Sequence, residues 1–183
     1  AYAEKLRAFL PRHQAENGFQ IITGDAARGA AEYAAKTAYK ETDAATYQAM
    51  EALVHNLNTM NSRAGAQVPF SSLNYGTDTS PEGRMAVHNL LRATEAGLGD
   101  GETPIFPVQI FKVKEGVNYN EGDPNYDLFR HALRCSAKRL FPNFSFLDAP
   151  FNLQYYKPGD YNTEVAYMGC RTRVMGNVFD NTK

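Results

Sequence analysis

The sequence has few of the residues that bind metals or form disulfides. It contains two cysteines, Cys135 and Cys170, which lie 35 positions apart, and it has no Cys-x-x-Cys pair. Its four histidines are not clustered, so no metal site can be argued from the sequence. Two cysteines outside a disulfide-dense pattern favour a reduced, cytoplasmic setting. No segment approaches the apolar run that spans a bilayer, and residues 1–5 lack the apolar stretch of a secretory signal.

The chain also lacks an excess of charge of either sign. It has 19 basic and 20 acidic residues, for a formal net charge of −1. A protein that holds a nucleic-acid backbone needs a clustered basic face, so we expect no nucleic-acid partner. A length of 183 residues corresponds to one domain with a sizeable core. Residues 1–45 are alanine-rich and predict a helical lead-in of unknown role, interrupted by a short apolar segment at residues 19–23.

Three amphipathic helices are expected next, because apolar residues recur at helical spacing. The first is well marked from Asp43 and stops near Gly65; its apolar stripe is Met50, Leu53, Val54, Leu57 and Met60. The second opens with Ser80 as the capping residue and Pro81 in the first turn; its stripe is Val87, Leu90, Leu91, Thr94 and Leu98. The third starts at Asp123 and stops before Pro142; its inward residues are Phe129, Ala132, Leu133, Ser136 and Leu140.

Strands are expected between these helices. Residues 68–75 predict one, with Pro69 confining it to an edge, a bulge or the strand's beginning. Residues 105–113 are apolar and rich in β-branched and aromatic side chains, as in a central strand buried on both faces. Residues 144–147 and 165–168 complete the set. Strands that alternate with helices at this spacing indicate an α/β fold with parallel pairing.

Cys170 is the candidate catalytic residue. It follows a short apolar run and Gly169, which permits a sharp bend, and Arg171 and Arg173 bring positive charge to either side of Thr172. A cysteine is reactive when it is partly exposed beside cationic groups, because the thiolate or a sulfur-centred radical does the chemistry. The local pattern alone also fits a buried structural cysteine in a strand-to-loop turn. We expect Cys170 on an irregular loop at the end of a short extended segment.

The other cysteine and the histidines have simpler interpretations. Cys135 lies within the third predicted helix, toward the flank of its apolar stripe, and is expected to be a small hydrophobic filler. His55 and His131 fall on polar helix faces and His88 borders an apolar stripe, so each is expected to be solvated or at a rim. His13 has no interpretable context.

Several polar residues have a structural interpretation beside a functional one. Ser71 and Ser72 could offer hydroxyls to a phosphate or a ribose, but such serines more often satisfy neighbouring backbone groups. Arg63 could contact an anion, or form a surface ion pair. Residues 77–80 combine turn and capping signals, so a local structural role explains them without any chemistry. Residues 112–115, which include Lys112, Lys114 and Glu115, are expected to form a solvated strand end.

Four long motifs carry a resemblance to a known family. Residues 168–175 read Met-Gly-Cys-Arg-Thr-Arg-Val-Met. Upstream lie residues 56–72, which contain Asn-Leu-Asn-Thr-Met-Asn-Ser-Arg-Ala-Gly-Ala-Gln, then Tyr-Gly-Thr-Asp-Thr-Ser at 75–80, and a block at 101–151 with Pro-Ile-Phe-Pro and Arg-Leu-Phe-Pro. In this order they resemble the anaerobic (class III) ribonucleoside-triphosphate reductases, which are oxygen-sensitive glycyl-radical enzymes. The match runs from about residue 49 to residue 180.

The resemblance implies a fold and a reaction. Residues 46–183 would form part of the ten-stranded α/β barrel of ribonucleotide reductases, in which a finger loop at residues 165–176 threads the barrel and presents Cys170 at the barrel's centre. A stored glycyl radical would take the hydrogen atom of the Cys170 thiol. The resulting thiyl radical would abstract the 3′ hydrogen of the ribose, and the 2′ hydroxyl would leave as water. Formate would supply the reducing equivalents.

The resemblance also implies cofactors and partners. The family uses a glycyl radical and a structural four-cysteine zinc site, neither of which has a counterpart in this sequence. The implied partners are a ribonucleoside triphosphate substrate, dNTP and ATP effectors, a radical-SAM activating protein and a second copy in a homodimer. We therefore expect a piece of a longer polypeptide or a shortened family member, and expect the isolated chain to be inactive.

Two alternatives remain open at this point. One is a glycyl-radical lyase of the pyruvate formate-lyase type, although that pattern expects adjacent cysteines and residues 169–171 do not supply them. The other is a non-catalytic remnant that binds a nucleotide or a reductase subunit.

Overall fold

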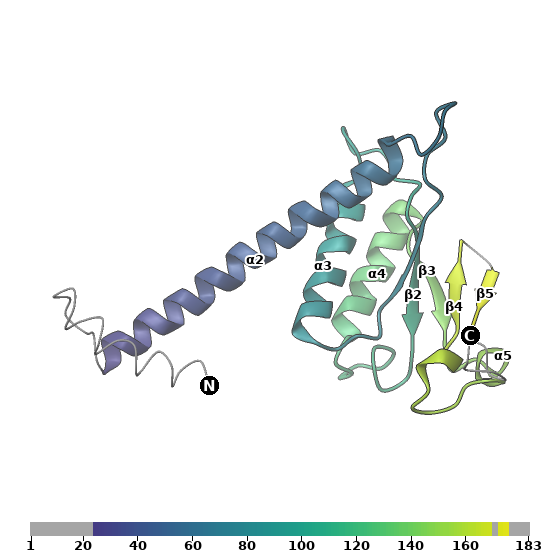
Figure 1. Cartoon of the computed structure of the whole chain (residues 1–183). Helices are drawn as coiled ribbons and strands as arrows, with labels where there is room; N and C mark the ends of the chain where they lie inside the picture. Colours follow the sequence, from purple (N-terminus) through teal and green to yellow (C-terminus); the bar gives the residue numbers. More distant parts are fainter. Residues whose placement is uncertain (1–23, 170–171, 176–183) are drawn as a thin grey trace. The chain divides into compact units, whose positions relative to one another are not determined.

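A computed structural model describes residues 24–169 and 172–175 (Figure 1). The chain divides into two compact units, Ala1–Thr42 and Asp43–Lys183. Helix α2 (Asp25–Thr59) has residues in both units, so the helix begins well before Asp43. The alanine-rich start of α2 explains this, because alanine has the highest intrinsic helix propensity. In the described part of the chain, no helix is long and apolar enough to cross a membrane.

The second unit holds a three-stranded parallel sheet with the order β1-β2-β3. Its strands are β1 (Ser72–Tyr75), β2 (Val108–Val113) and β3 (Asn143–Phe146), and its longer helices are α3 (Pro81–Ala96) and α4 (Tyr126–Arg139). Short elements follow: α5 (Pro150–Leu153), a 3-10 turn (Tyr161–Thr163), and the antiparallel strands β4 (Ala166–Met168) and β5 (Thr172–Val174). The parallel α/β prediction is confirmed. The ten-stranded barrel stays a prediction.

The start of the second predicted helix is confirmed. Ser80 caps α3, because its hydroxyl accepts a hydrogen bond of 3.1 Å from the Gly83 N–H. Asp78 braces the cap by accepting a 2.8 Å bond from the Ser80 N–H. The helix ends at Ala96 and is followed by Gly97, whose φ of 87° favours glycine. Of the predicted stripe, the members that are buried are Val87, Leu90, Leu91 and Thr94.

The sheet has two chemically different faces, because successive side chains of a strand point to opposite sides. We call the first the helix face: α3 and α4 lie side by side against it (Figure 1). Its members are Leu73, Tyr75, Gln109, Phe111, Val113, Phe144 and Phe146. Phe111 is fully buried there, with its ring 5.7 Å from that of Tyr75 and 6.1 Å from that of Phe144. Burial of one such side chain contributes about 1.5–3 kcal/mol.

We call the opposite side the hairpin face, because β4 and β5 lie on it (Figure 1). Its members are Ser72, Asn74, Val108, Ile110, Lys112, Asn143 and Ser145. It mixes polar with apolar side chains, whereas the helix face is mainly aromatic and aliphatic. The sequence does not predict this division, since strand assignment alone does not tell which side a helix covers.

The predicted strand at 105–113 is confirmed as the central strand, but it is shorter than expected. β2 begins at Val108, after a cis bond between Phe106 and Pro107, and Ile105 is 65% exposed. The backbone N–H groups of Ile105 and Phe106 donate instead to the side-chain oxygen of Asn58, at 2.9 and 3.0 Å. β1 likewise begins at Ser72, and Met60, past the end of α2, is exposed.

The inward face of α4 differs from the predicted stripe. Its buried residues are Leu128, His131, Ala132 and Cys135. Leu133 is exposed, and Leu140 is 81% exposed at the left-handed end of the helix. The helix begins at Tyr126 and not at Asp123. As a result, the side chains at positions 128, 131, 132 and 135 face α3 and the sheet. His131 is buried, so the expectation that it is solvated or at a rim was wrong.

Candidate active site

The predicted cysteine turn lies between two paired strands. In the β4–β5 pair, Met168 is opposite Thr172 and Ala166 is opposite Val174. Cys170 and Arg171, between the strands, lie outside the described residues, so the loop position of the cysteine stays a prediction. The strands place the ends of the segment that carries Cys170 next to each other on the hairpin face.

Gly169 has a backbone conformation that favours glycine. Its φ is 64°, in the left-handed region. A Cβ atom added there would lie 3.2 Å from Cε1 of Phe70, which is closer than ordinary van der Waals contact. Glycine therefore relieves both a backbone strain and a steric conflict at the residue before Cys170.

Two side chains of β1 hold β4 against the sheet. The Asn74 amide donates a 2.7 Å hydrogen bond to the Tyr167 carbonyl and accepts a 2.8 Å bond from the Tyr167 N–H. Ser72, on the same face, accepts a 3.2 Å bond from the Gly169 N–H. Asn74 thus pairs with the β4 backbone as another strand would. Together the two residues fix the chain immediately before Cys170.

Sequence reasoning found only half of this arrangement. Satisfying a backbone group, one of the two roles considered for Ser72, is the one observed. Asn74 was missed, because its partner lies 93 positions away along the chain. The signal that was available is the alternation of Ser72 and Asn74 on one face of a strand.

A nearly buried ion pair lies farther along the hairpin face. Lys112 Nζ is 2.6 Å from Glu164 Oε1, and the two side chains are only 12% and 18% exposed. Lys114 also has a partner, because its ammonium lies 3.2 Å from the Tyr156 hydroxyl. Of the strand end expected to be solvated, only Glu115 is exposed. The expectation was wrong for Lys112 because the segment before β4 returns across the sheet and supplies Glu164.

Ser145 is a buried hydroxyl group with no hydrogen-bond partner in the described part of the chain. The residue is 4% exposed and lies beside Lys112 in the register of β2 and β3. Leaving a buried donor unsatisfied costs about 1–3 kcal/mol. The oxygen has almost no solvent-accessible surface, so this cost is not recovered by contact with water.

Two buried asparagines brace the carboxyl ends of β1 and β2. The Asn118 amide donates to the carbonyls of Gly76 and Lys112 at 2.9 and 2.8 Å. The Asn125 amide donates to the carbonyls of Gly76 and Asp78 at 3.1 and 2.7 Å. Gly76 has a φ of 121°, and an added Cβ would come within 2.8 Å of the Lys112 carbonyl. Sequence reasoning missed both asparagines, since their partners are distant backbone groups.

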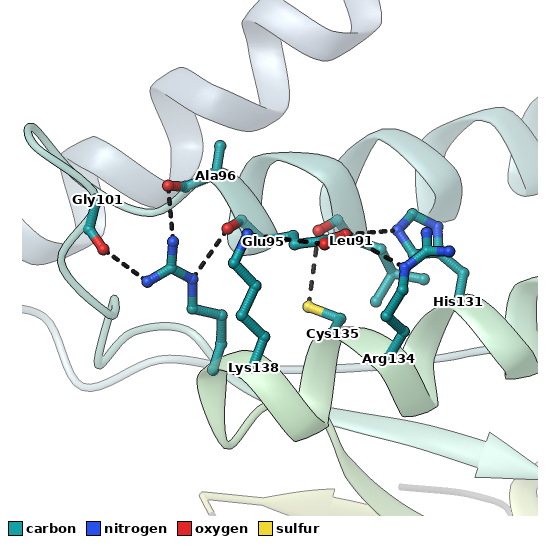
Figure 2. Close-up of polar contacts among 9 residues, drawn as sticks. Leu91, Glu95, Ala96, Gly101, His131, Arg134, Cys135 and Lys138 are labelled. Atoms are coloured by element: carbon teal, nitrogen blue, oxygen red, sulfur yellow. Dashed lines mark hydrogen bonds and ion pairs between the residues drawn. The ribbon is translucent and has the colours of Figure 1, made fainter.

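Cys135 is confirmed as a buried structural cysteine. It is 0% exposed in the core between α3 and α4, and its thiol donates to the Leu91 carbonyl at 3.7 Å (Figure 2). Burial raises the pKa of the Cys135 thiol to about 11. A thiol in this state is a poor nucleophile.

His131 has an acidic neighbour across the helix pair. Its Nε2 lies 3.3 Å from Glu95 Oε2, and Glu95 also faces Arg134 and Lys138, each at 3.8 Å (Figure 2). Burial lowers the pKa of His131, and the hydrogen bond to Glu95 opposes this effect. His88 is exposed, as expected, with its ring 5.2 Å from that of His131. Within the described residues, no group of three or more His, Cys, Asp or Glu could hold a metal ion.

Comparison with known proteins gives the family. The family model described as anaerobic ribonucleoside-triphosphate reductase matches residues 22–183. The chain is 35% identical over 127 residues to the anaerobic ribonucleoside-triphosphate reductase of Escherichia coli (strain K12), covering 69% of this chain and 17% of that protein. It is 39% identical over 136 residues to the enzyme of the same name from Enterobacteria phage T4, covering 74% of this chain and 22% of that protein.

The matched proteins are oxidoreductases by name. The chain belongs to the anaerobic ribonucleoside-triphosphate reductase family. It spans about a fifth of the length of the curated relatives it matches.

Proposed function

We propose that this chain supplies the hydrogen-abstracting thiol, Cys170, and part of the barrel wall of an enzyme that reduces ribonucleoside triphosphates to deoxyribonucleoside triphosphates. The observation that carries the proposal is the attachment of the segment before Cys170 to the hairpin face, where Ser72 bonds Gly169 and Asn74 bonds Tyr167. A radical relay requires the sulfur and the sugar to meet in van der Waals contact. Such contact requires that the ends of the loop are held in a fixed position.

The chemistry assigned to Cys170 is reversible transfer of a hydrogen atom. The glycyl radical of the family, once formed, would supply the unpaired electron that Cys170 receives. The Cys170 thiol would give up its hydrogen atom, take the 3′ hydrogen of the ribose, and so restore its S–H bond. Loss of the 2′ hydroxyl as water would then need two electrons, for which formate, oxidised to carbon dioxide, is the proposed source. Cys170 would finally return the 3′ hydrogen atom to the sugar, which regenerates the thiyl radical.

The hairpin face offers polar groups to a substrate near the cysteine segment. Ser72 and Asn74 lie on it beside the strand that leads to Cys170, and the charges of Lys112 and Glu164 farther along it balance each other. A face of this kind suits an uncharged sugar better than a triphosphate tail. We therefore assign it to ribose contacts.

The remaining family partners are proposals for the complete gene product. They are a radical-SAM activating protein, dNTP and ATP effectors, a homodimer and a structural zinc ion. Within the described residues no donor set fits zinc, so the ion would be bound elsewhere. A cytoplasmic location would keep Cys170 reduced.

The test is an anaerobic assay of the activated complete gene product with ribonucleoside triphosphate and formate. Cys170→Ala should remove deoxynucleotide formation. Cys135→Ala, the matched control, should keep most of the activity, provided that its fold is verified by circular dichroism. A non-catalytic remnant predicts no activity for the unaltered protein. A product rate that is unchanged by Cys170→Ala would contradict the assignment.

A further inference from the structure

A pocket with two arginines and two histidines lies between α3 and α4, apart from the hairpin face. It has a volume of about 410 Å³ and is lined by His88, Asp127, Arg130, His131 and Arg134. Its volume falls in the range of small-molecule sites, about 300–1,000 Å³. His88 and Arg134 are exposed, so the pocket opens to solvent. Nothing in the reaction proposed above uses these residues.

The four lining residues of α4 share one side of the helix. Asp127, Arg130, His131 and Arg134 follow the spacing i, i+3, i+4, i+7, which brings side chains together on one face. Arg130 and Arg134 are one turn apart and can present two guanidinium groups to one ligand. His88 from α3 completes the wall, with its ring 5.2 Å from that of His131.

The carboxylates near the pocket already have cation partners. Asp127 is paired with Arg84 at 2.8 Å. Glu95 lies 3.8 Å from both Arg134 and Lys138. Within the described residues, no carboxylate lies within 4.0 Å of the Arg130 guanidinium. The pocket therefore holds positive charge that the protein does not neutralise.

We propose that this pocket binds a phosphate-chain anion, either a free polyphosphate or the triphosphate tail of a nucleotide. The planar guanidinium group of an arginine matches the oxygen geometry of phosphate and forms paired hydrogen bonds with it. The volume exceeds what one phosphate group fills, which favours a chain of two or three. Asp127 also borders the site, and its ion pair with Arg84 offsets its negative charge.

His131 makes this binding depend on pH. His131 faces Glu95 and His88 from α3 and Arg134 on α4, and its burial favours the neutral ring. A bound polyanion stabilises the protonated ring, so binding takes up protons. The affinity should rise as the pH falls from about 8 toward 6.5, near the ordinary pKa of histidine.

The test uses isothermal titration calorimetry of the 183-residue chain with inorganic triphosphate, at pH 6.5 and pH 8.0. We expect one saturable site per chain and tighter binding at pH 6.5. Arg130→Gln should weaken binding about tenfold or more, because it removes a charge-assisted contact. Arg63→Gln, which changes an exposed arginine outside the pocket, should leave the affinity unchanged. Arg130→Lys keeps the positive charge but lacks the planar guanidinium group, and it should cause an intermediate loss of affinity.

Titration with ATP separates the two sources of the anion. Equal affinity for ATP and triphosphate assigns the pocket to the phosphate chain alone, and tighter ATP binding assigns it to a nucleotide. The proposal is overturned if the unaltered chain shows no saturable binding, or if Arg63→Gln weakens binding as much as Arg130→Gln. Should Arg130→Gln change the circular dichroism spectrum, Arg134→Gln replaces it and must show a loss of the same order.

Discussion

The attachment of β4 to the sheet through Asn74 can be tested with a single truncation. Asn74→Ala removes both the bond donated to the Tyr167 carbonyl and the bond accepted from the Tyr167 N–H. A typical hydrogen bond contributes about 0.5–1.5 kcal/mol net, so two amount to about 1–3 kcal/mol. If this loss opens β4 locally, the Tyr167 amide should exchange with solvent roughly 5- to 150-fold faster, since 1.4 kcal/mol is tenfold.

Hydrogen exchange followed by nuclear magnetic resonance measures this amide directly. The matched control is Asn143→Ala, an exposed asparagine on the same face of β3, which should leave the Tyr167 amide unchanged. Exchange at Tyr167 that is the same in Asn74→Ala as in the unaltered chain would refute the claim that this side chain secures β4. Equal acceleration by the control would show a general loss of stability instead.

Three further predictions concern single residues. Gly169→Ala should lower the free energy of unfolding by about 1–2 kcal/mol, because φ is 64° and the new Cβ meets Phe70. Urea denaturation measures this change, and an unchanged midpoint would contradict the claim that an alanine is strained at this position. Burial lowers the folded-state pKa of His131, so the unfolded chain binds the proton more readily. The free energy of unfolding should therefore fall as the pH drops below about 6.5. His131→Leu should flatten this dependence in urea denaturation measured between pH 7.5 and 5.5. Cys135, with a pKa of about 11 and no exposure, should resist iodoacetamide at pH 8 in the folded chain and react after unfolding, as site-resolved mass spectrometry would detect.

Features with a local cause were predictable from the sequence. The start of α3 follows from Ser80 and Pro81, whose capping and backbone preferences act within one turn. The central position of β2 follows from its apolar residues, which need partners on both sides. The buried, structural role of Cys135 follows from its place beside an apolar stripe.

Features with a distant cause were not predictable. The rotation of α4 depends on which residues meet α3 and the sheet, and a stripe shifted by one position looks equally apolar in sequence. The contact of His131 with Glu95 and that of Asn74 with Tyr167 join residues 36 and 93 positions apart. Helical or strand periodicity carries no information about such partners. The assignment of Cys170 depended on the family resemblance, because its local pattern fits a structural cysteine as well.

The central claim is that Cys170 abstracts hydrogen while the initiating radical is stored elsewhere. Electron paramagnetic resonance of the activated complete gene product carrying Cys170→Ala tests it most directly, with deoxynucleotide formation measured on the same sample. The account predicts a persistent glycyl radical signal together with no deoxynucleotide, since storage and abstraction occupy separate residues. Deoxynucleotide formation at the unaltered rate in this variant would contradict the claim.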